Sequence, residues 1–325
     1  MTPTLFENTH FPKAKTYWYM GKFYDWSEGF LHPMTHGLHY GTSVFEGIRA
    51  YPTDRGPAVF RLSEHIDRFL YSAGVIKMTS PYDKDAIIRA VLQTIRKNRL
   101  TSCYIRPLLF YSYGSLGIVP KASPVELAIA TWDWGAYLGE KSWNGVSVYI
   151  HPLRRVHHSQ VDMRAKLGGL YIQSMICGIE TRALGFDEAI FLNLEGRIAE
   201  GPGENVYVVK KGVLKTNDVT ESILEGITRT SVLAIAKDLG YETTVGPVTQ
   251  EEFFAADEVF FTGTAVEVVP IIRVRDGSDR AKKPKDYVIG TGRAGTITGN
   301  IRARYLDIVH GKVKKYAKWL TYVNE

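Results

Sequence analysis

The chain has 325 residues, of which 45% are hydrophobic and 23% are charged. These proportions are those of globular proteins, so wholesale disorder and collagen-like repeats are excluded. At roughly 150 residues per domain, the length predicts two domains or one large one. The chain contains only two cysteines, Cys103 and Cys177, which excludes a disulfide framework and an all-cysteine zinc site.

The charge is mildly basic, with 40 Lys and Arg against 34 Asp and Glu and a net charge of +6. This balance favours solubility and some attraction for small anions. The basic cluster at residues 310–319 is interpreted as a solvated helix face, so no nucleic-acid partner is expected. No stretch approaches ~20 consecutive apolar residues, and the N-terminal segment lacks the apolar part of a signal peptide. We therefore expect a cytoplasmic protein without a membrane span.

The first part of the chain is expected to contain short strands and one long helix. Apolar residues recur at helical spacing between residues 85 and 99, which predicts the helix. A strand is expected at 103–111, where alternation would place Tyr104 and Arg106 on one face. The other strands are expected within 15–30, around a turn at Gly21-Lys22, and at 126–132.

A glycine-rich segment then predicts a boundary, with a small N-terminal domain at 1–136, an interdomain loop at 137–145 and a large domain at 146–325. Strands and helices mix without strict alternation, which favours two α+β or mixed α/β lobes over a barrel. The large domain is expected to hold a strand from 146, a loop at 153–165, a helix at 169–184, hairpins within 188–200 and 205–216, a helix from Gly226 to Gly240, a capping box at Thr249 and Glu252, a strand at 257–265 and a helix at 295–309.

Two formal patterns are set aside. Residues 290–295 read GTGRAG, but only 30 residues follow, too few for a dinucleotide-binding half, so we interpret this GxGxxG as turns that cap the last helix. His32, His36 and His39 have the spacing of one helix face, but Pro33 and the nearby glycines favour a loop. No metal site is expected.

Four segments could carry chemistry. The segment at 224–231 would open a helix with backbone N–H groups and hydroxyls, either a phosphate seat or an ordinary capped helix start. A second hydroxyl-bearing turn, at 262–265, ends a strand. Glu200 lies on a rigid turn, either orienting a ring nitrogen or simply solvated, and Lys166 could form an imine in a cleft.

Taken together, these segments resemble the class IV, fold type IV pyridoxal-phosphate aminotransferases, and within them the branched-chain amino acid aminotransferases. The resemblance covers residues 17 to 311 and implies a two-lobed fold like that of D-amino acid aminotransferase. Its motifs are HGLHYGTSVFEGIRAY (36–51), SEHIDRF (63–69), YIRP (104–107), WGAYLG (134–139), AKLGGLY (165–171), EGPGENVYVVKKGVL (200–214), LEGITR (224–229) and FFTGTAVEVVP (260–270).

The resemblance implies pyridoxal 5′-phosphate as cofactor, carried on Lys166 as an internal aldimine. Lys166 would also be the catalytic general base, and Glu200 would hold the pyridine nitrogen protonated. Tyr171 would bind the phenolic oxygen and Leu224 would pack on the ring. The phosphate would be held by Arg68, Ile227, Thr228 and Thr264.

The resemblance also implies transamination of Leu, Ile and Val with 2-oxoglutarate, giving branched 2-oxo acids and glutamate. Arg106 would pair the side-chain carboxylate of glutamate, and the α-carboxylate would meet Tyr104 and the N–H groups of Thr264 and Ala265. At least a homodimer is implied, with a trimer of dimers left open. The apolar pocket would be lined by Tyr40, Phe45, Gly47, Ile118, Trp134 and Tyr137, with Arg49 supporting it.

The chain departs from the family pattern at a few positions. Leu170 stands where Asn is frequent, Pro202 replaces a small residue, and Ile118 stands where Val is frequent. These departures leave related fold type IV reactions as alternatives: a D-amino acid or (R)-amine transaminase, or an aminodeoxychorismate lyase. Retention of Tyr40, Phe45, Gly47 and the Tyr104-Ile105-Arg106 set argues against the lyase and the D-amino acid transaminase, and activity toward (R)-amines stays open.

Overall fold

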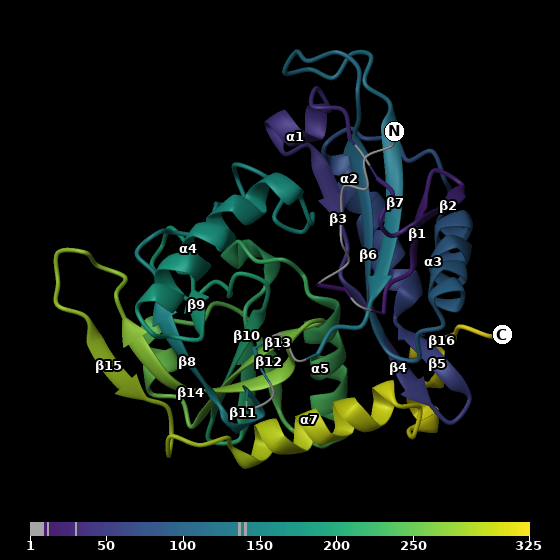
Figure 1. Cartoon of the computed structure of the whole chain (residues 1–325). Coiled ribbons are helices and arrows are strands. Elements are labelled where there is room, and N and C mark those ends of the chain that lie inside the picture. Colours follow the sequence, from purple (N-terminus) through teal and green to yellow (C-terminus); the bar gives the residue numbers. More distant parts are fainter. Residues whose placement is uncertain (1–9, 12, 30, 136–137, 140–141) are drawn as a thin grey trace. The chain divides into compact units, whose positions relative to one another are not determined.

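The computed structural model describes residues 10–11, 13–29, 31–135, 138–139 and 142–325, and its backbone divides into two compact units (Figure 1). Unit 1 comprises residues 1–134, 165–169 and 307–325, and unit 2 comprises 135–164 and 170–306. Neither unit is a continuous stretch of chain. The lysine segment 165–169 groups with unit 1, whereas the domain limits expected from the sequence stay a prediction.

Unit 1 is built on an eight-stranded sheet with the order β16-β5-β4-β6-β7-β1-β2, in which β3 pairs with β6. Helices α2 and α3 pack against each other and against this sheet. The elements are β1 Thr16–Tyr19, β2 Lys22–Asp25, α1 His36–Tyr40, β3 Ser43–Phe45, β4 Ile48–Thr53, β5 Gly56–Phe60, α2 Leu62–Val75, α3 Lys84–Asn98, β6 Cys103–Tyr111, β7 Val125–Trp132, the 3₁₀ helix η4 Lys314–Trp319 and β16 Leu320–Tyr322.

Strand β6 changes partner in its middle, opposite Glu46 and Gly47, which connect β3 to β4. Its first residues pair with β4 and its last residues pair with β3. Pro107 lies between the two pairings, where its missing N–H costs no ladder hydrogen bond. There the backbone N–H of Glu46 donates to the Pro107 carbonyl over 3.1 Å. Glu46 and Gly47 thus lie between the β3 and β4 ladders, and the Glu46 side chain is buried.

Unit 2 is built on a second eight-stranded sheet with the order β12-β11-β10-β13-β14-β8-β9, and β15 pairs with β14. Its core consists of β-branched and aromatic side chains such as Val148, Val208 and Phe261. The elements are η1 Ser142–Asn144, β8 Val146–Ile150, α4 Tyr171–Ala183, β9 Glu188–Ile190, β10 Asn205–Lys210, β11 Val213–Thr216, η3 Val219–Glu221, α5 Ile227–Asp238, β12 Thr243–Val245, α6 Gln250–Phe254, β13 Glu258–Gly263, β14 Glu267–Asp276 and β15 Lys285–Val288. The 3₁₀ helix η2 Gly168–Leu170 and helix α7 Thr296–Val309 each contain residues of both units.

The expected mixed α/β fold is confirmed, and the structure adds that it contains two sheets; most of the expected elements are also confirmed. The strand at 103–111 has the predicted limits, and the capping box of α6 forms as expected. The predicted turn at Gly21-Lys22 lies one residue earlier, at Met20-Gly21, where both residues have positive φ. The loop expected around His36 is wrong, because His36–Tyr40 form the short helix α1. Within the described residues, no helix is both long and apolar enough to cross a bilayer.

Strand β9 carries a buried carboxylate whose environment predicts a pH-dependent stability. Glu188 is 1% exposed, and within the described residues its Oε2 has no hydrogen-bond partner. Burial, with a smaller contribution from the charge of Asp187, raises the pKa of Glu188, while the Ala189 N–H and Arg182 oppose the shift. The protonated carboxyl is therefore favoured in the folded protein.

A carboxyl whose folded pKa is raised stabilises the fold fully below its unfolded pKa, and this contribution is lost as pH rises through the folded pKa. The free energies of unfolding of the native protein and of Glu188→Gln, measured with denaturant, should therefore diverge as pH rises above the ordinary carboxyl pKa. We expect the free energy of unfolding of the variant to increase relative to that of the native protein by about 1–3 kcal/mol. A constant difference between pH 4 and pH 8 would contradict the prediction.

Candidate active site

The backbone of Lys166 is fixed by two elements of unit 1. Its N–H donates to Ser72 Oγ over 2.9 Å, and its carbonyl accepts the Phe45 N–H over 3.3 Å. The segment continues alongside β3 through a bridge between Leu167 and Val44. The Lys166 Nζ lies 4.8 Å from the centroid of the Phe45 ring. These contacts direct the amine across an aromatic face.

Helix α2 carries Arg68 one turn before Ser72. The Arg68 guanidinium donates to both oxygens of Glu46, with Nε–Oε1 at 2.6 Å and Nη2–Oε2 at 2.9 Å. His65 Nδ1 lies 2.8 Å from the same Oε2. Because a bidentate pair fixes the guanidinium plane, Glu46 sets the direction in which the other edge of Arg68 can bind an anion.

The Glu46 side chain is fully buried, as is His65. Burial alone would raise the pKa of Glu46, but the charge of Arg68 and the His65 contact more than offset it, so the pKa lies well below its usual range. Burial lowers the pKa of His65, and the attraction of Glu46 only partly opposes this. Glu46 is therefore the anionic partner in the ion pair with Arg68.

Arg106 lies in an aromatic wall of unit 1. Its guanidinium carbon is 4.7 Å from the ring centroid of Phe45, 5.4 Å from that of Tyr104 and 5.8 Å from that of Trp132. The shared face expected for Tyr104 and Arg106 is confirmed. Within the described part of the chain, the buried Arg106 Nε has no hydrogen-bond partner. The Phe45 ring thus contacts both the Lys166 amine and this cation.

Gly47 is required by the position of Tyr104. A Cβ at residue 47 would lie 1.8 Å from Tyr104 Oη, so any larger residue would displace the phenol. The Tyr104 ring packs edge-on against Trp134, with centroids 4.6 Å apart. Arg49 Nη2 donates to the Trp134 carbonyl over 3.4 Å, which agrees with a supporting position.

Helix α1 holds the loop that carries Ile118. His36 is buried and contacts Thr42 Oγ1 at 2.8 Å and the Gly117 carbonyl at 2.9 Å. Tyr40 Oη donates to the Leu116 carbonyl over 2.9 Å. Ile118 itself is 81% exposed. Both ring nitrogens of His36 therefore have partners, and the contact of Nε2 with Gly117 fixes the loop that carries Ile118.

In unit 2, the Glu200 carboxylate is fixed on both oxygens. Arg155 contacts Oε1 at 2.9 Å through Nε, and both residues are at most 4% exposed. The N–H of Leu224 donates to Oε2 over 3.0 Å, and Asn205 Nδ2 lies 3.3 Å from the same oxygen. An arginine partner and two further donors favour the ionised form of a buried carboxylate.

The two hydroxyl-bearing turns of the sequence both lie in unit 2. Helix α5 begins with Gly226 at its N-cap, a residue without a side chain that could cap the helix, and Thr228 in its first turn is buried. The turn after β13 contains Thr264 and Ala265. Just before it, the buried Thr262 Oγ1 has no hydrogen-bond partner among the described residues. Both turns therefore offer donors to an anion.

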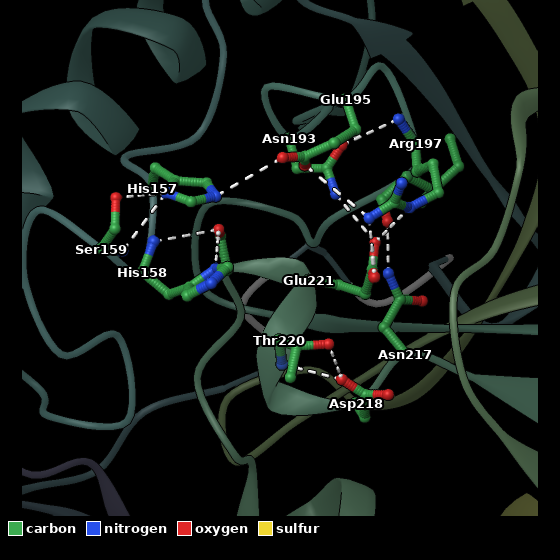
Figure 2. A network of polar contacts seen from close by, with 12 residues as sticks. His157, His158, Ser159, Asn193, Glu195, Arg197, Asn217, Asp218, Thr220 and Glu221 are labelled. Atoms are coloured by element: carbon green, nitrogen blue, oxygen red, sulfur yellow. Dashed lines mark hydrogen bonds and ion pairs between the residues drawn. The ribbon is translucent and has the colours of Figure 1, made fainter.

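A polar network supports the segment that leads to Leu224, as Figure 2 shows. Glu221 accepts from Arg197 Nε over 2.6 Å and Nη2 over 2.9 Å, and from Asn193 over 2.8 Å. His157 faces Glu195 with a separation of 3.5 Å, and His158 contacts Ser222 at 3.2 Å. The loop before Lys166 is thereby tied to the residues just before Leu224.

The GTGRAG segment precedes a helix that already has an anion at its start. The Glu258 carboxylate accepts the N–H of Ile297 over 3.0 Å and that of Thr298 over 2.7 Å. The first amides of α7 are therefore occupied by a side chain of the protein. Residues 290–295 do form glycine turns before the last helix, but the group that caps the helix is the Glu258 side chain and not these turns.

The residues singled out from the sequence are divided between the two units. Lys166, Arg68, Phe45, Tyr104 and Arg106 belong to unit 1, together with Tyr40, Gly47, Arg49, Ile118 and Trp134. Unit 2 holds Tyr171, at the first residue of α4, and Glu200, Leu224, Ile227, Thr228, Thr264 and Ala265. Tyr137 lies outside the described residues.

Sequence reasoning missed Glu46, His65, Arg155 and Asn205 as partners of the site. Glu46 could have been found, because FEGIR and SEHIDRF both lay in the motifs. Arg155 gave no local signal, since one arginine in a charged loop resembles any other.

The family model for class IV aminotransferases matches residues 43–274. The chain belongs to the class IV aminotransferases. Among class IV relatives, the branched-chain-amino-acid aminotransferase of Pseudomonas aeruginosa is 42% identical over 94% of this chain and 96% of its own length. That of Escherichia coli K12 is 39% identical over 96% of this chain and 99% of its own length.

Solved structures agree with this assignment to class IV. A branched-chain amino acid aminotransferase from T.th., solved with pyridoxamine 5′-phosphate, has a TM-score of 0.89 and 42% identity, over 96% of this chain and 99% of the other. The Escherichia coli enzyme has a TM-score of 0.90 and 37% identity, over 96% of this chain and 100% of the other. Class IV aminotransferases depend on pyridoxal 5′-phosphate. The residues of each unit suit part of that cofactor. Unit 1 offers an amine and an arginine, and unit 2 offers a fixed carboxylate, an uncapped helix start and a buried hydroxyl without a partner among the described residues.

Proposed function

We propose that this class IV aminotransferase transfers the amino group of leucine, isoleucine or valine to 2-oxoglutarate. The products are the branched 2-oxo acid and L-glutamate, so that the donor Cα becomes a carbonyl carbon and the acceptor gains the amine. The 37–42% identity to enzymes named for this reaction supports the proposal.

The observation that carries the proposal is the setting of Arg106. The reaction needs one pocket that accepts an apolar branched side chain and also a second carboxylate. Phe45, Tyr104 and Trp132 supply apolar surface, and Arg106 lies among them with an unpartnered Nε among the described residues. An apolar wall with one unmatched cation suits both kinds of substrate.

When bound, pyridoxal phosphate supplies the aldehyde carbon that takes the amino group and the ring that receives the electron pair of the broken Cα–H bond. Lys166 would attach the cofactor in the resting enzyme, and its released amine would carry the proton from the substrate Cα to the cofactor carbon that takes the amino group. Glu200, whose carboxylate contacts Arg155, would hold a proton at the ring nitrogen.

The other site residues are proposed to bind and orient the cofactor and the substrate. Tyr171 contacts the phenolic oxygen and Leu224 packs on the ring. Arg68, Ile227, Thr228 and Thr264 hold the phosphate, with Glu46 fixing the arginine plane. The substrate is contacted by Tyr40, Phe45, Gly47, Arg49, Tyr104, Arg106, Ile118, Trp134, Tyr137, Thr264 and Ala265.

A panel of amino donors with 2-oxoglutarate tests the proposed function. Leucine, isoleucine and valine should be used with kcat/KM values at least about 10-fold above those of phenylalanine, D-alanine and an (R)-amine. The reason is that branched aliphatic side chains match the apolar surface of the proposed pocket best. Production of pyruvate from aminodeoxychorismate, or a preference for D-amino acids or (R)-amines, would overturn the assignment.

We also propose that the chain works as a homodimer at least. Helix α4 supports this, because Ile172, Met175, Ile176 and Ile179 form a stripe at helical spacing and are 38–62% exposed. Ile118 and Val119 expose further apolar surface on unit 1. Apolar surfaces of this kind mark interfaces.

Ile179→Asp should therefore weaken assembly. We expect the dimer dissociation constant to rise by at least about 10-fold, equivalent to about 1.4 kcal/mol, in analytical ultracentrifugation. Val245→Asp, at a 51% exposed position on the edge strand β12, is the matched control and should assemble normally. Unchanged assembly of Ile179→Asp would show that α4 lies outside the interface.

The cytoplasmic location is part of the proposal. Both cysteines are free and buried, which is typical of proteins kept in reducing surroundings.

A further inference from the structure

Asn205 is the first residue of β10 and is buried, with 5% exposure. Its side-chain amide contacts the Glu200 turn and the segment that leads into α5, and its backbone pairs with the end of β13. Each of these segments carries residues to which the proposed function assigns a cofactor contact.

The Nδ2 group of Asn205 has two acceptors. It lies 3.3 Å from Glu200 Oε2 and 2.8 Å from the Leu224 carbonyl. The Leu224 N–H donates to the same Glu200 oxygen over 3.0 Å. The three groups form a closed ring of contacts, so the carboxylate cannot shift without moving Leu224.

The other face of the amide touches the helix start. An ideal Cβ on Gly226 would lie 2.0 Å from Asn205 Oδ1, so the amide oxygen leaves no room for a side chain at the N-cap. On the other side, Asn205 pairs with Thr262 in the ladder between β10 and β13. Thr262 is a residue whose buried hydroxyl has no partner among the described residues, two positions before Thr264.

We propose that Asn205 is a positioning residue that sets the spacing between the carboxylate for the ring nitrogen and the two turns for the phosphate. This inference rests on the proposed function of these groups. A cofactor with a rigid ring and a phosphate on one side needs both ends of its site at a fixed separation. One buried planar amide, with its Nδ2 bonded to Glu200 and Leu224 and its Oδ1 close to Gly226, sets that separation at low entropic cost.

Asn205→Ser is the test, because serine is too short to reach Glu200 and Leu224 together. Asn98→Ser is the matched control: Asn98 is a buried asparagine of unit 1 whose amide bridges Thr16 and Thr131. Apoproteins would be titrated with pyridoxal 5′-phosphate. We expect the dissociation constant to rise at least about 10-fold in Asn205→Ser and to stay within about 2-fold in Asn98→Ser.

A second measurement separates positioning from general stability. With ring-nitrogen-labelled cofactor, the ¹⁵N shift reports protonation at the atom that Glu200 faces in the proposed site. We expect Asn205→Ser to lower the pH at which this nitrogen loses its proton by about one unit, in the direction of Glu200→Gln. Thermal unfolding of both apoproteins gives the stability loss for comparison.

Three outcomes are distinct. Tight binding and an unchanged ¹⁵N titration in Asn205→Ser would overturn the inference, as would an equal loss of affinity in Asn98→Ser. If native apoprotein fails to bind the cofactor at all, the proposed function itself fails. Weaker binding together with the shifted titration, in Asn205→Ser only, supports the inference.

Discussion

Lys166→Ala is expected to lower kcat for leucine transamination by roughly four orders of magnitude, since the variant loses both the cofactor attachment and the proton-moving amine. The contacts of unit 1 support the choice of this lysine. Its backbone is bonded on both sides, to Ser72 and to Phe45, and its amine crosses the Phe45 ring at 4.8 Å. A visible absorbance band of the cofactor-loaded protein should also disappear.

Borohydride reduction followed by peptide mass spectrometry checks the attachment. The cofactor mass should appear on the peptide with Lys166 in the native protein and nowhere in the variant. Lys283→Ala, at an exposed lysine, is the control and should keep the band and the activity. A band that survives in Lys166→Ala, with the cofactor on another lysine, would refute the assignment.

Arg106→Met is expected to separate the two halves of the reaction. The variant keeps an apolar stem against Phe45 and Tyr104 but has no charge for a second carboxylate. We expect kcat/KM for 2-oxoglutarate to fall about 100-fold or more and that for leucine to fall less than about 10-fold. Leucine brings one carboxylate, which the proposed site binds at Tyr104 and the turn at Thr264.

Stopped-flow absorbance of each half-reaction measures the two values separately. Arg89→Met, at an exposed arginine on α3, should leave both unchanged. Arg106→Lys retains charge without the planar fork, so it should recover part of the 2-oxoglutarate rate. Equal losses for leucine and 2-oxoglutarate in Arg106→Met would remove this role from Arg106.

Local patterns explain why most elements were predictable. The helix at 85–99 and the strand at 103–111 show strong periodicity, and the hairpin of β10 and β11 has Lys211-Gly212 at its turn, both with positive φ. Helix α1 was missed because it has only five residues and follows a proline. Its stability comes from His36 and the Gly117 loop, a contact across 81 positions that no local window contains.

The site was predictable where a motif joins chemistry to a recognisable sequence context, as for Lys166 and Glu200. The residues that hold these groups were not, because their roles depend on pairing between distant strands and loops. Arg155 reaches Glu200 across 45 positions, and Asn205 meets Leu224 across 19. Burial gives these side chains their importance, and burial follows from the tertiary fold.

The final strand bears on how the polypeptide can be cut or rearranged. Strand β16, Leu320–Tyr322, pairs with β5 as an outer strand of the N-terminal sheet, and residues 307–325 group with unit 1. A protein truncated at residue 306 would therefore expose a bare β-edge on the opposite half of its sequence, which promotes aggregation. Strand β16 thus completes an edge of the same sheet that contains β1 and β2.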